Sequence, residues 1–300
     1  MRASLLLVVL AACDTGDTLV VGSKKFTESV VLGEVATQLL RSEGAAVRHA
    51  SELGGTRVLW NGLRAGEIDL YVEYTGTLRQ ELFAGEDLPG EEALRARLVE
   101  EGVALSGPLG FNNTYALGMR EARAEELGIE RISELARHPE LELGFGNEFL
   151  DRGDGWPSLS AAYGLGSFQP IGLDHDLAYR GLATGEIDVM DLYSTDAEIA
   201  HYGLRVLADD RSHFPRYDAV LLWRDDLDAR LANALYRLPG TLDEPTIIAM
   251  NARAKLEGVP ASLVAAGFLR DELGLLVEVD EDSLVARLVR STGEHLVLVG

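Results

Sequence analysis

Two tyrosines occupy equivalent positions in two similar segments of the chain. Tyr74 and Tyr193 each lie eight residues after the glycine of a Gly-Glu-Ile-Asp sequence, at 66–69 and 185–188, so the two copies are 119 positions apart. Each copy is typical of a helix that ends at glycine and is followed by a short apolar strand. Open α/β sheets bind ligands at the carboxyl ends of their strands. The repeat therefore predicts two similar lobes that present matching tyrosines to a site between them; a chance match of four residues is the alternative.

Two further tyrosines begin predicted strands. Tyr115 and Tyr217 bracket the middle hundred residues, where the chain would cross from the first lobe to the second and back. Four tyrosine rings around one point would form a cage for a quaternary ammonium group, because its diffuse charge is attracted to ring faces by about 0.5–2 kcal/mol per contact. For any one of these tyrosines, the alternative is packing over the edge of a core with the hydroxyl in water.

The elements that must position these rings alternate between helix and strand. Helices are expected after Thr27, which would cap the first of them, and after the Gly54-Gly55 turn. Further helices are expected at 91–101, 121–128 and 132–137, and the chain from 227 onward is expected to be mostly helical. The expected strands, besides those that end at Tyr74 and Tyr193, are 18–22, 115–119, 141–145, 204–207 and 217–223, and 147–157 is expected to be a loop. This alternation predicts an α/β fold with mainly parallel sheets.

The composition excludes several classes of function. A chain of 300 residues suits two lobes, and its 47% hydrophobic and 25% charged residues are typical of a soluble globular protein. No apolar run after residue 12 reaches 18 residues, so no membrane span is predicted. The balance of 49 acidic against 27 basic residues gives a net charge of −22. Binding to nucleic acid or to an anionic membrane surface requires a basic face, and neither is predicted.

The single cysteine lies in a sequence typical of a lipoprotein signal. Leu10-Ala11-Ala12-Cys13 follows a short apolar stretch and precedes the polar residues 14–17. We therefore expect residues 1–17 to be a signal and tether, with lipid attached to Cys13 at the outer face of the cytoplasmic membrane. A buried free thiol is the alternative. With no second cysteine, no intrachain disulfide can form.

Motifs for catalysis, metal binding and cofactor binding are missing. The sequence has no GxxxxGK[ST], HExxH or GxSxG motif and no cysteine pair for zinc. Its six histidines are scattered; His175, between Asp174 and Asp176, is predicted to be a solvated loop residue. We therefore expect a protein that is not an enzyme and uses no cofactor or metal.

Seven separated segments resemble one family. They are Gly22–Glu28, Gly54–Thr56, Tyr71–Thr77, Asn113–Ala116, Asp151–Gly155, Tyr193–Asp196 and Tyr217–Ala219. Together they resemble the substrate-binding protein of osmoprotectant (glycine betaine/choline/carnitine) ABC importers, over about residues 18–272. The resemblance implies a two-lobed periplasmic binding protein-like fold of type II, with two crossover strands and a ligand cleft between the lobes. The expected lobes are 18–114 plus 218–274 and 115–217.

The resemblance also implies roles for individual residues. The cage of the family falls on Tyr74, Tyr115, Tyr193 and Tyr217. Its carboxylate-binding groups fall on Lys24, Arg152 and Thr77, and a polar cleft position that is aspartate in a relative falls on Asn113. Lys24 precedes a helix N-terminus, which favours an anion. Arg152 could clamp the same carboxylate with two parallel hydrogen bonds, or pair with Asp151 or Asp154.

The resulting hypothesis is a lipid-anchored extracytoplasmic receptor that passes glycine betaine or proline betaine to an ABC permease and its ATPase subunit. Choline would leave Lys24 and Arg152 without an anion, which is costly in a closed cleft. A receptor for choline, carnitine or ergothioneine and a sensory ligand-binding domain are alternatives. An enzyme of prephenate-dehydratase or deaminase type with the same fold is a further alternative, but it would need a nucleophile or general base that the seven segments lack.

The last residues, 275–300, form a tail that the resemblance to binding proteins does not cover. Residues 280–292 are expected to form an amphipathic helix capped by Ser283. Residues 293–300 resemble the start of the permease subunit of the same importers. A plain last strand at 296–299 is the alternative.

Overall fold

The computed structural model describes residues 18–279, and its first sheet has five strands in the order β2-β1-β3-β10-β4. These strands are β1 (Leu19–Lys24), β2 (Val47–Gly54), β3 (Leu70–Tyr74), β4 (Val103–Leu105) and β10 (Ala219–Arg224). Strand β1 runs parallel to β2 and β3, whereas β10 runs antiparallel to β3 and β4. Tyr74 is the last residue of β3, as predicted, and β3 lies in the middle of the sheet.

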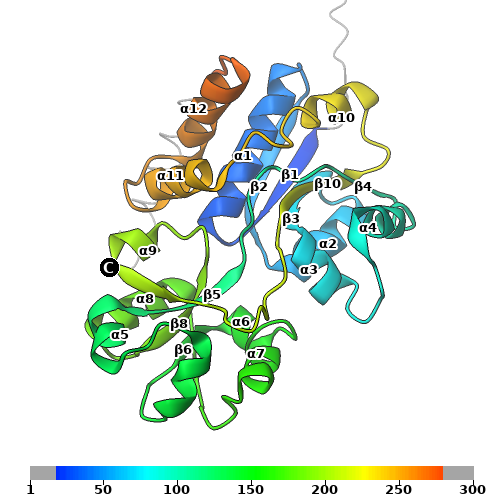
Figure 1. The fold of residues 1–300 in the computed structure, drawn as a ribbon. Helices are drawn as coiled ribbons and strands as arrows, with labels where there is room; N and C mark the ends of the chain where they lie inside the picture. Colours follow the sequence, from blue (N-terminus) through cyan, green and yellow to red (C-terminus); the bar gives the residue numbers. More distant parts are fainter. Residues whose placement is uncertain (1–17, 280–300) are drawn as a thin grey trace, which may run out of the picture.

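Helices cover this sheet (Figure 1). They are α1 (Thr27–Ser42), α2 (Thr56–Ala65), α3 (Thr75–Thr77), the π-helical turn Leu78–Leu82, α4 (Gly90–Val99), α10 (Ala229–Leu235), α11 (Glu244–Lys255) and α12 (Ala261–Leu273). Helix α1 packs against α10, α11 and α12. Its buried side chains Val31, Val35 and Leu39 recur every four residues, the spacing of one helix face.

The middle of the chain builds two smaller sheets. Strands β5 (Tyr115–Arg120), β8 (Val189–Tyr193) and β9 (Leu204–Leu207) form an antiparallel sheet in the order β8-β5-β9, and β6 (Gly144–Gly146) pairs in parallel with β7 (Ile171–Leu173). The helices here are α5 (Glu121–Leu127), the 3-10 helix Ile132–Arg137, α6 (Asn147–Asp151), α7 (Trp156–Tyr163), α8 (His175–Thr184) and α9 (Glu198–His201).

Two crossing segments join these two groups of elements (Figure 1). They run antiparallel and meet at a bridge between Asn112 and Asp218, next to the hydrogen bond from the amide of Asn113 to the carbonyl of Tyr217 (3.0 Å). The strands that follow the two crossing segments, β5 and β10, each run antiparallel to the strands beside them. The prediction of mainly parallel sheets is therefore wrong, because β5 and β10 are antiparallel to the strands that carry the matching tyrosines.

The predicted repeat corresponds to two equivalent structural units. Helices α2 and α8 both end at a glycine with a left-handed backbone, Gly66 (φ 73°) and Gly185 (φ 84°), which a residue with a Cβ would adopt only with strain. Each glycine leads into a five-residue strand that ends in tyrosine, β3 or β8. The aspartates of the repeat, Asp69 and Asp188, also act alike, since each accepts a hydrogen bond from a backbone amide of a neighbouring segment.

Several local predictions are wrong. Phe26, not Thr27, is the N-cap of α1, and it makes no capping bond through its side chain. Strand β2 was not predicted, because its largely exposed face carries polar residues. Segment 147–157 is not a continuous loop, since it contains α6 and the start of α7; Arg152 lies at the end of α6 in extended backbone. The strand predicted at 217–223 begins two residues later, at Ala219.

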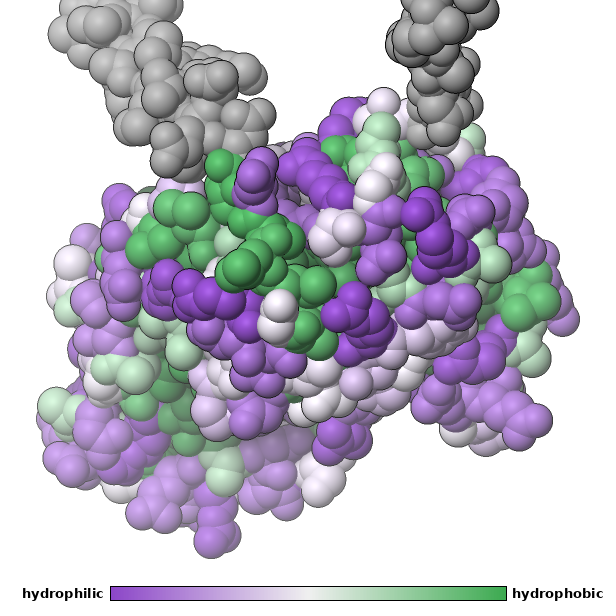
Figure 2. Space-filling view, turned by 90° about the horizontal axis from the view of Figure 1, so that it is seen from above, coloured by the Kyte–Doolittle hydropathy of each residue, from purple (hydrophilic) through white to green (hydrophobic). Residues whose placement is uncertain are grey.

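Cys13 and the tail features predicted at 280–300 lie outside the described residues. Within 18–279, no helix is long and apolar enough to cross a membrane, and no three or more His, Cys, Asp or Glu side chains gather as a metal site. Figure 2 shows the molecule from above the view of Figure 1, with apolar residues gathered among hydrophilic ones. The exposed apolar side chains of the C-terminal region include Leu263 and Leu276.

Candidate ligand-binding site

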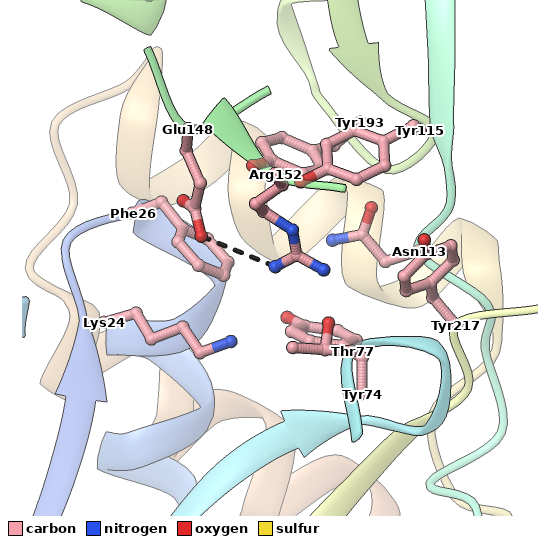
Figure 3. A pocket seen from close by; sticks show the side chains of 10 residues that line it. All are labelled: Lys24, Phe26, Tyr74, Thr77, Asn113, Tyr115, Glu148, Arg152, Tyr193 and Tyr217. Carbon is pink, nitrogen blue, oxygen red and sulfur yellow. Dashed lines mark ion pairs between the residues drawn. The ribbon is translucent and has the colours of Figure 1, made fainter. Parts of the chain in front are cut away.

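One pocket contains all eight side chains that the sequence analysis assigns to ligand binding (Figure 3). Its lining consists of Lys24, Phe26, Tyr74, Thr77, Asn113, Tyr115, Glu148, Arg152, Tyr193 and Tyr217. Phe26 and Glu148 were not predicted. Phe26 lies inside the sequence block 22–28, two residues after Lys24, so its position next to a predicted site residue was the available signal.

The aromatic rings of the pocket form a continuous set. The Tyr115 ring lies 5.3 Å from that of Tyr193 and 5.8 Å from that of Tyr217, measured between centroids. Phe26 joins Tyr193 to Tyr74, at 5.9 and 6.3 Å. These separations are those of aromatic pairs in contact. Five rings, rather than four, are therefore available to a diffuse positive charge.

The hydroxyl groups of two cage tyrosines are held by buried carboxylates. Tyr74 donates to Oε1 of Glu28 (2.6 Å) and Tyr217 donates to Oδ2 of Asp154 (2.7 Å). Burial raises the pKa of all four cage tyrosines above the ordinary value. The hydroxyls therefore stay protonated at physiological pH, and the rings face the pocket as neutral phenols.

Lys24 is paired within the protein. Its Nζ donates to Oε1 of Glu73 (2.5 Å) and to Oγ1 of Thr56 (3.0 Å), and it lies 5.4 Å from the centroid of the Tyr74 ring. Lys24 and Glu73 are both buried. The ammonium group therefore contacts the cage and already has an anionic partner.

Arg152 is likewise paired within the protein, with Asp154, as in one of the two predicted alternatives. Its Nε and Nη2 donate to the two carboxylate oxygens of Asp154 (2.7 and 2.6 Å), and Nη1 lies 3.5 Å from Oε1 of Glu148. The guanidinium projects into the pocket (Figure 3), 5.7 Å from the Tyr115 centroid. Burial lowers the pKa of Arg152, but the bonds to Asp154 outweigh it and raise the pKa overall. The edge expected to clamp a ligand carboxylate is occupied by Asp154, and a ligand carboxylate on the Nη1 side would share that group with Glu148.

This pairing changes the argument about choline. Choline is expected from the sequence to leave Lys24 and Arg152 without an anion, but Glu73 and Asp154 already pair with these two cations. A ligand without a carboxylate would therefore not strand two unpaired buried cations, and that argument against choline is wrong.

The remaining two predicted residues line the pocket beside the cage. Thr77 ends the short helix α3, three residues after Tyr74. Asn113 donates from Nδ2 to Oε1 of Glu28 (2.9 Å), and its buried Oδ1 has no hydrogen-bond partner in the described structure. That oxygen could accept a hydrogen bond from a ligand.

Gly76 makes room for a cage ring. A Cβ at this position would lie 2.4 Å from Cδ1 of Tyr217. We expect Gly76→Ala to push this ring out of place, destabilise the protein by about 1–3 kcal/mol and lower ligand affinity. Gly62→Ala is the matched control, because its Cβ would meet no atom closer than 3.7 Å. Urea unfolding and calorimetric titration measure both effects; equal behaviour of the two variants would contradict the packing argument.

The prediction that His175 is a solvated loop residue is wrong. It is the first residue of α8, its ring lies 5.2 Å from that of Tyr193, and its Nε2 lies 3.1 Å from Oδ2 of Asp196. Burial lowers the pKa of His175, but the contacts with Asp196 and Asp191 outweigh this and raise the pKa to about 9. The histidine therefore supports the outer side of a cage ring as an imidazolium.

The raised pKa of His175 predicts a pH dependence of stability. A folded-state pKa of about 9 against an ordinary value of 6.5 means that the folded protein holds the proton more tightly. The contribution is complete below about pH 6.5 and is lost as the pH rises through 9. We expect the free energy of unfolding to fall over this window, and the fall to be smaller in His175→Gln. The same slope in both proteins, measured by urea unfolding, would refute this role.

The fold and the pocket define a class before any relative is considered. Two groups of elements joined by two crossing segments, with a pocket between them lined by both, are the features of a two-lobed solute-binding protein of periplasmic type II. The chain belongs to the family described as the substrate binding domain of ABC-type glycine betaine transport systems, whose model matches residues 17–271. This family consists of transport proteins rather than enzymes.

Two curated relatives and one solved structure show the range of the family. The glycine-betaine-binding protein of Pseudomonas aeruginosa is 34% identical over 274 residues, which cover 85% of this chain and 88% of the relative. The ergothioneine transport permease/ergothioneine binding protein EgtU of Helicobacter pylori is 31% identical over 268 residues; the match covers 86% of this chain but spans about half (48%) of that protein's length. The crystal structure of a glycine betaine/carnitine/choline ABC transporter protein superposes with a TM-score of 0.69 at 25% identity, covering 84% of this chain and 98% of that one.

Proposed function

We propose that the protein is the receptor of an ABC importer for a quaternary ammonium zwitterion of the glycine betaine or proline betaine type. The observation that carries this proposal is the convergence of five aromatic rings with Lys24 and Arg152 in one pocket. The rings attract the ammonium through their faces. Each of the two cations lies next to a ring, which supports a ligand that joins a carboxylate to that ammonium.

The ligand carboxylate must share these cations with protein carboxylates. The donors that we propose for it are Thr77 and Nη1 of Arg152, which it would share with Glu148 (3.5 Å). The mixed lining therefore favours a small zwitterion whose carboxylate contacts Thr77 and Arg152 while its methyl groups face the rings.

Choline is a second candidate, and a specific observation favours it. Because Glu73 and Asp154 neutralise Lys24 and Arg152, the pocket can accept a cation without an anion. The unpaired Oδ1 of Asn113 could then accept a hydrogen bond from the hydroxyl of choline. Carnitine and ergothioneine also carry a quaternary ammonium group and remain alternatives.

We further propose that the lobes are 18–114 plus 218–274 and 115–217, and that they close over the ligand by bending at the crossing segments. The closed form would be presented to a permease that works with an ATPase subunit. Anchoring through lipid on Cys13 at the outer face of the cytoplasmic membrane, and the alternative of a sensory rather than a transport role, stay predictions.

The function is tested with a panel of glycine betaine, proline betaine, carnitine, choline and ergothioneine. We expect at least one of them to raise the melting temperature and to bind with 1:1 stoichiometry. Arg152→Ala is expected to weaken glycine betaine more than choline, since choline has no carboxylate. If no compound in the panel shifts the melting temperature, the proposed function is wrong; equal losses for both ligands would assign Arg152 to folding or lobe closure.

A further inference from the structure

The buried carboxylate of Glu28 gathers hydrogen bonds from four separate segments. Glu28 is the second residue of α1 and is 3% exposed. Its Oε1 accepts from the hydroxyl of Tyr74 (2.6 Å) and from Nδ2 of Asn113 (2.9 Å). Its Oε2 accepts from Oγ1 of Thr195 (2.6 Å) and from Nδ2 of Asn251 (3.1 Å). Each carboxylate oxygen therefore has two donors.

Of these four donors, Thr195 belongs to the lobe opposite Glu28. It lies two residues after the cage residue Tyr193 and is 1% exposed. Its backbone carbonyl also accepts a hydrogen bond from Nδ2 of Asn251 (3.1 Å). The hydroxyl and the carbonyl of Thr195 are thus both bound to the first lobe, the hydroxyl by α1 and the carbonyl by α11.

The Glu28–Thr195 contact is distinct from the ion pair at the rim of the cleft. Lys255 pairs with Asp176 across the lobes (2.6 Å), but both side chains are partly exposed. Exposed ion pairs contribute little to stability, whereas a hydrogen bond to a buried charged group contributes more. Between these two contacts, the one at Glu28 is the stronger candidate for holding the lobes together.

Glu28 also connects lobe closure to the cage. Its Oε1 fixes the hydroxyl of Tyr74 and the amide of Asn113, both of which line the ligand pocket. Burial raises the pKa of Glu28, and the hydrogen bonds from Thr195, Tyr74, Asn251 and Asn113 oppose this rise. Separating the lobes would remove Thr195 and leave one oxygen of a buried carboxylate with a single protein donor.

We propose that Glu28 is a positioning residue that latches the two lobes through Thr195 and at the same time orients Tyr74 and Asn113 in the cage. The latch stabilises the closed form whether or not ligand is present. Its effect on ligand affinity rests on the proposed function; its effect on closure does not.

The test compares lobe separation in ligand-free protein. Spin labels at Val99→Cys and Ile171→Cys, both exposed residues on opposite lobes, are placed in a Cys13→Ser background and their separation is measured by pulsed electron paramagnetic resonance. Thr195→Val removes the hydroxyl at almost constant volume and is expected to shift the distribution towards the open form. Thr195→Ser, which keeps the hydroxyl, is expected to match the unmodified chain.

Thr37→Val is the matched control. Thr37 is a buried threonine on α1 whose hydroxyl bonds within its own helix, to the carbonyl of Gly33 (2.8 Å). The Thr37→Val variant should have a lower free energy of unfolding but the same lobe separation as the unmodified protein. If Thr195→Val leaves the distribution as it is in Thr37→Val, the latch is refuted.

Glu28→Gln provides a second variant, because its amide can accept from one pair of donors and must face the other pair with its NH2 group. We expect it to open the ligand-free protein as Thr195→Val does, and an unchanged distribution would also refute the latch. With glycine betaine, Thr195→Val should weaken binding about tenfold, chiefly through faster dissociation. If the unmodified protein binds none of the panel while Thr195→Val still opens the lobes, the latch stands and the proposed function fails.

Discussion

Replacing Tyr193 with alanine is expected to weaken the binding of glycine betaine at least tenfold, about 1.4 kcal/mol. Tyr193 is central to the aromatic set, since its ring contacts both Tyr115 and Phe26. Its removal would take away one face for the ammonium and also the support of two neighbouring rings. Calorimetric titration of the variant and the unmodified protein measures the loss.

Two variants separate the role of this ring from general destabilisation. Tyr193→Phe keeps the ring and should keep most of the affinity. Tyr202→Ala removes a partly exposed tyrosine of the same lobe that stacks on Tyr179 outside the pocket, and it should not change binding. If Tyr193→Ala binds glycine betaine as tightly as the unmodified protein, the ammonium does not lie in the proposed cage.

Replacing Glu73 with glutamine is expected to lower the free energy of unfolding by about 3–5 kcal/mol. Glu73 is fully buried and pairs with Lys24, itself 4% exposed, so its removal leaves an uncompensated buried charge. Urea unfolding monitored by circular dichroism measures the change.

The matched control for this prediction is Glu81→Gln. Glu81 makes an ion pair of similar length with Arg57 (2.7 Å), but that arginine side chain is 59% exposed. The loss should stay below about 1 kcal/mol. The double variant Lys24→Met with Glu73→Gln should recover part of the stability, because no charge is then stranded. Similar losses for Glu73→Gln and Glu81→Gln would show that the Lys24 charge is not desolvated.

The sequence could predict the features that depend on local pattern. The repeated Gly-Glu-Ile-Asp segments predicted two helix–glycine–strand units, and the structure has both, each with its tyrosine at the strand end. The resemblance of seven short segments predicted the family, which is confirmed, and gathered eight residues that the fold brings into one pocket.

Some errors are local, such as the N-cap of α1 and helix α6 in place of a loop, but the errors at the site concern partners that lie far apart in the sequence. That Lys24 pairs with Glu73, 49 residues away, and that Glu28 meets Thr195, 167 residues away, depends on the three-dimensional fold rather than on any local signal. The same reason explains the antiparallel strands β5 and β10, whose direction is set by the chain crossing between lobes. His175 was judged from its aspartate neighbours in sequence, whereas its environment is set by Asp196 and Tyr193.

A crystal structure of the protein with glycine betaine tests the central claim most directly. We predict that the trimethylammonium group lies within about 6 Å of the ring centroids of Tyr74, Tyr115, Tyr193 and Tyr217. Its carboxylate should contact Thr77 and the Nη1 side of Arg152. A ligand bound instead in the neighbouring pocket that Asp174 and Glu198 line, with its ammonium next to these carboxylates and away from the four rings, would contradict this claim.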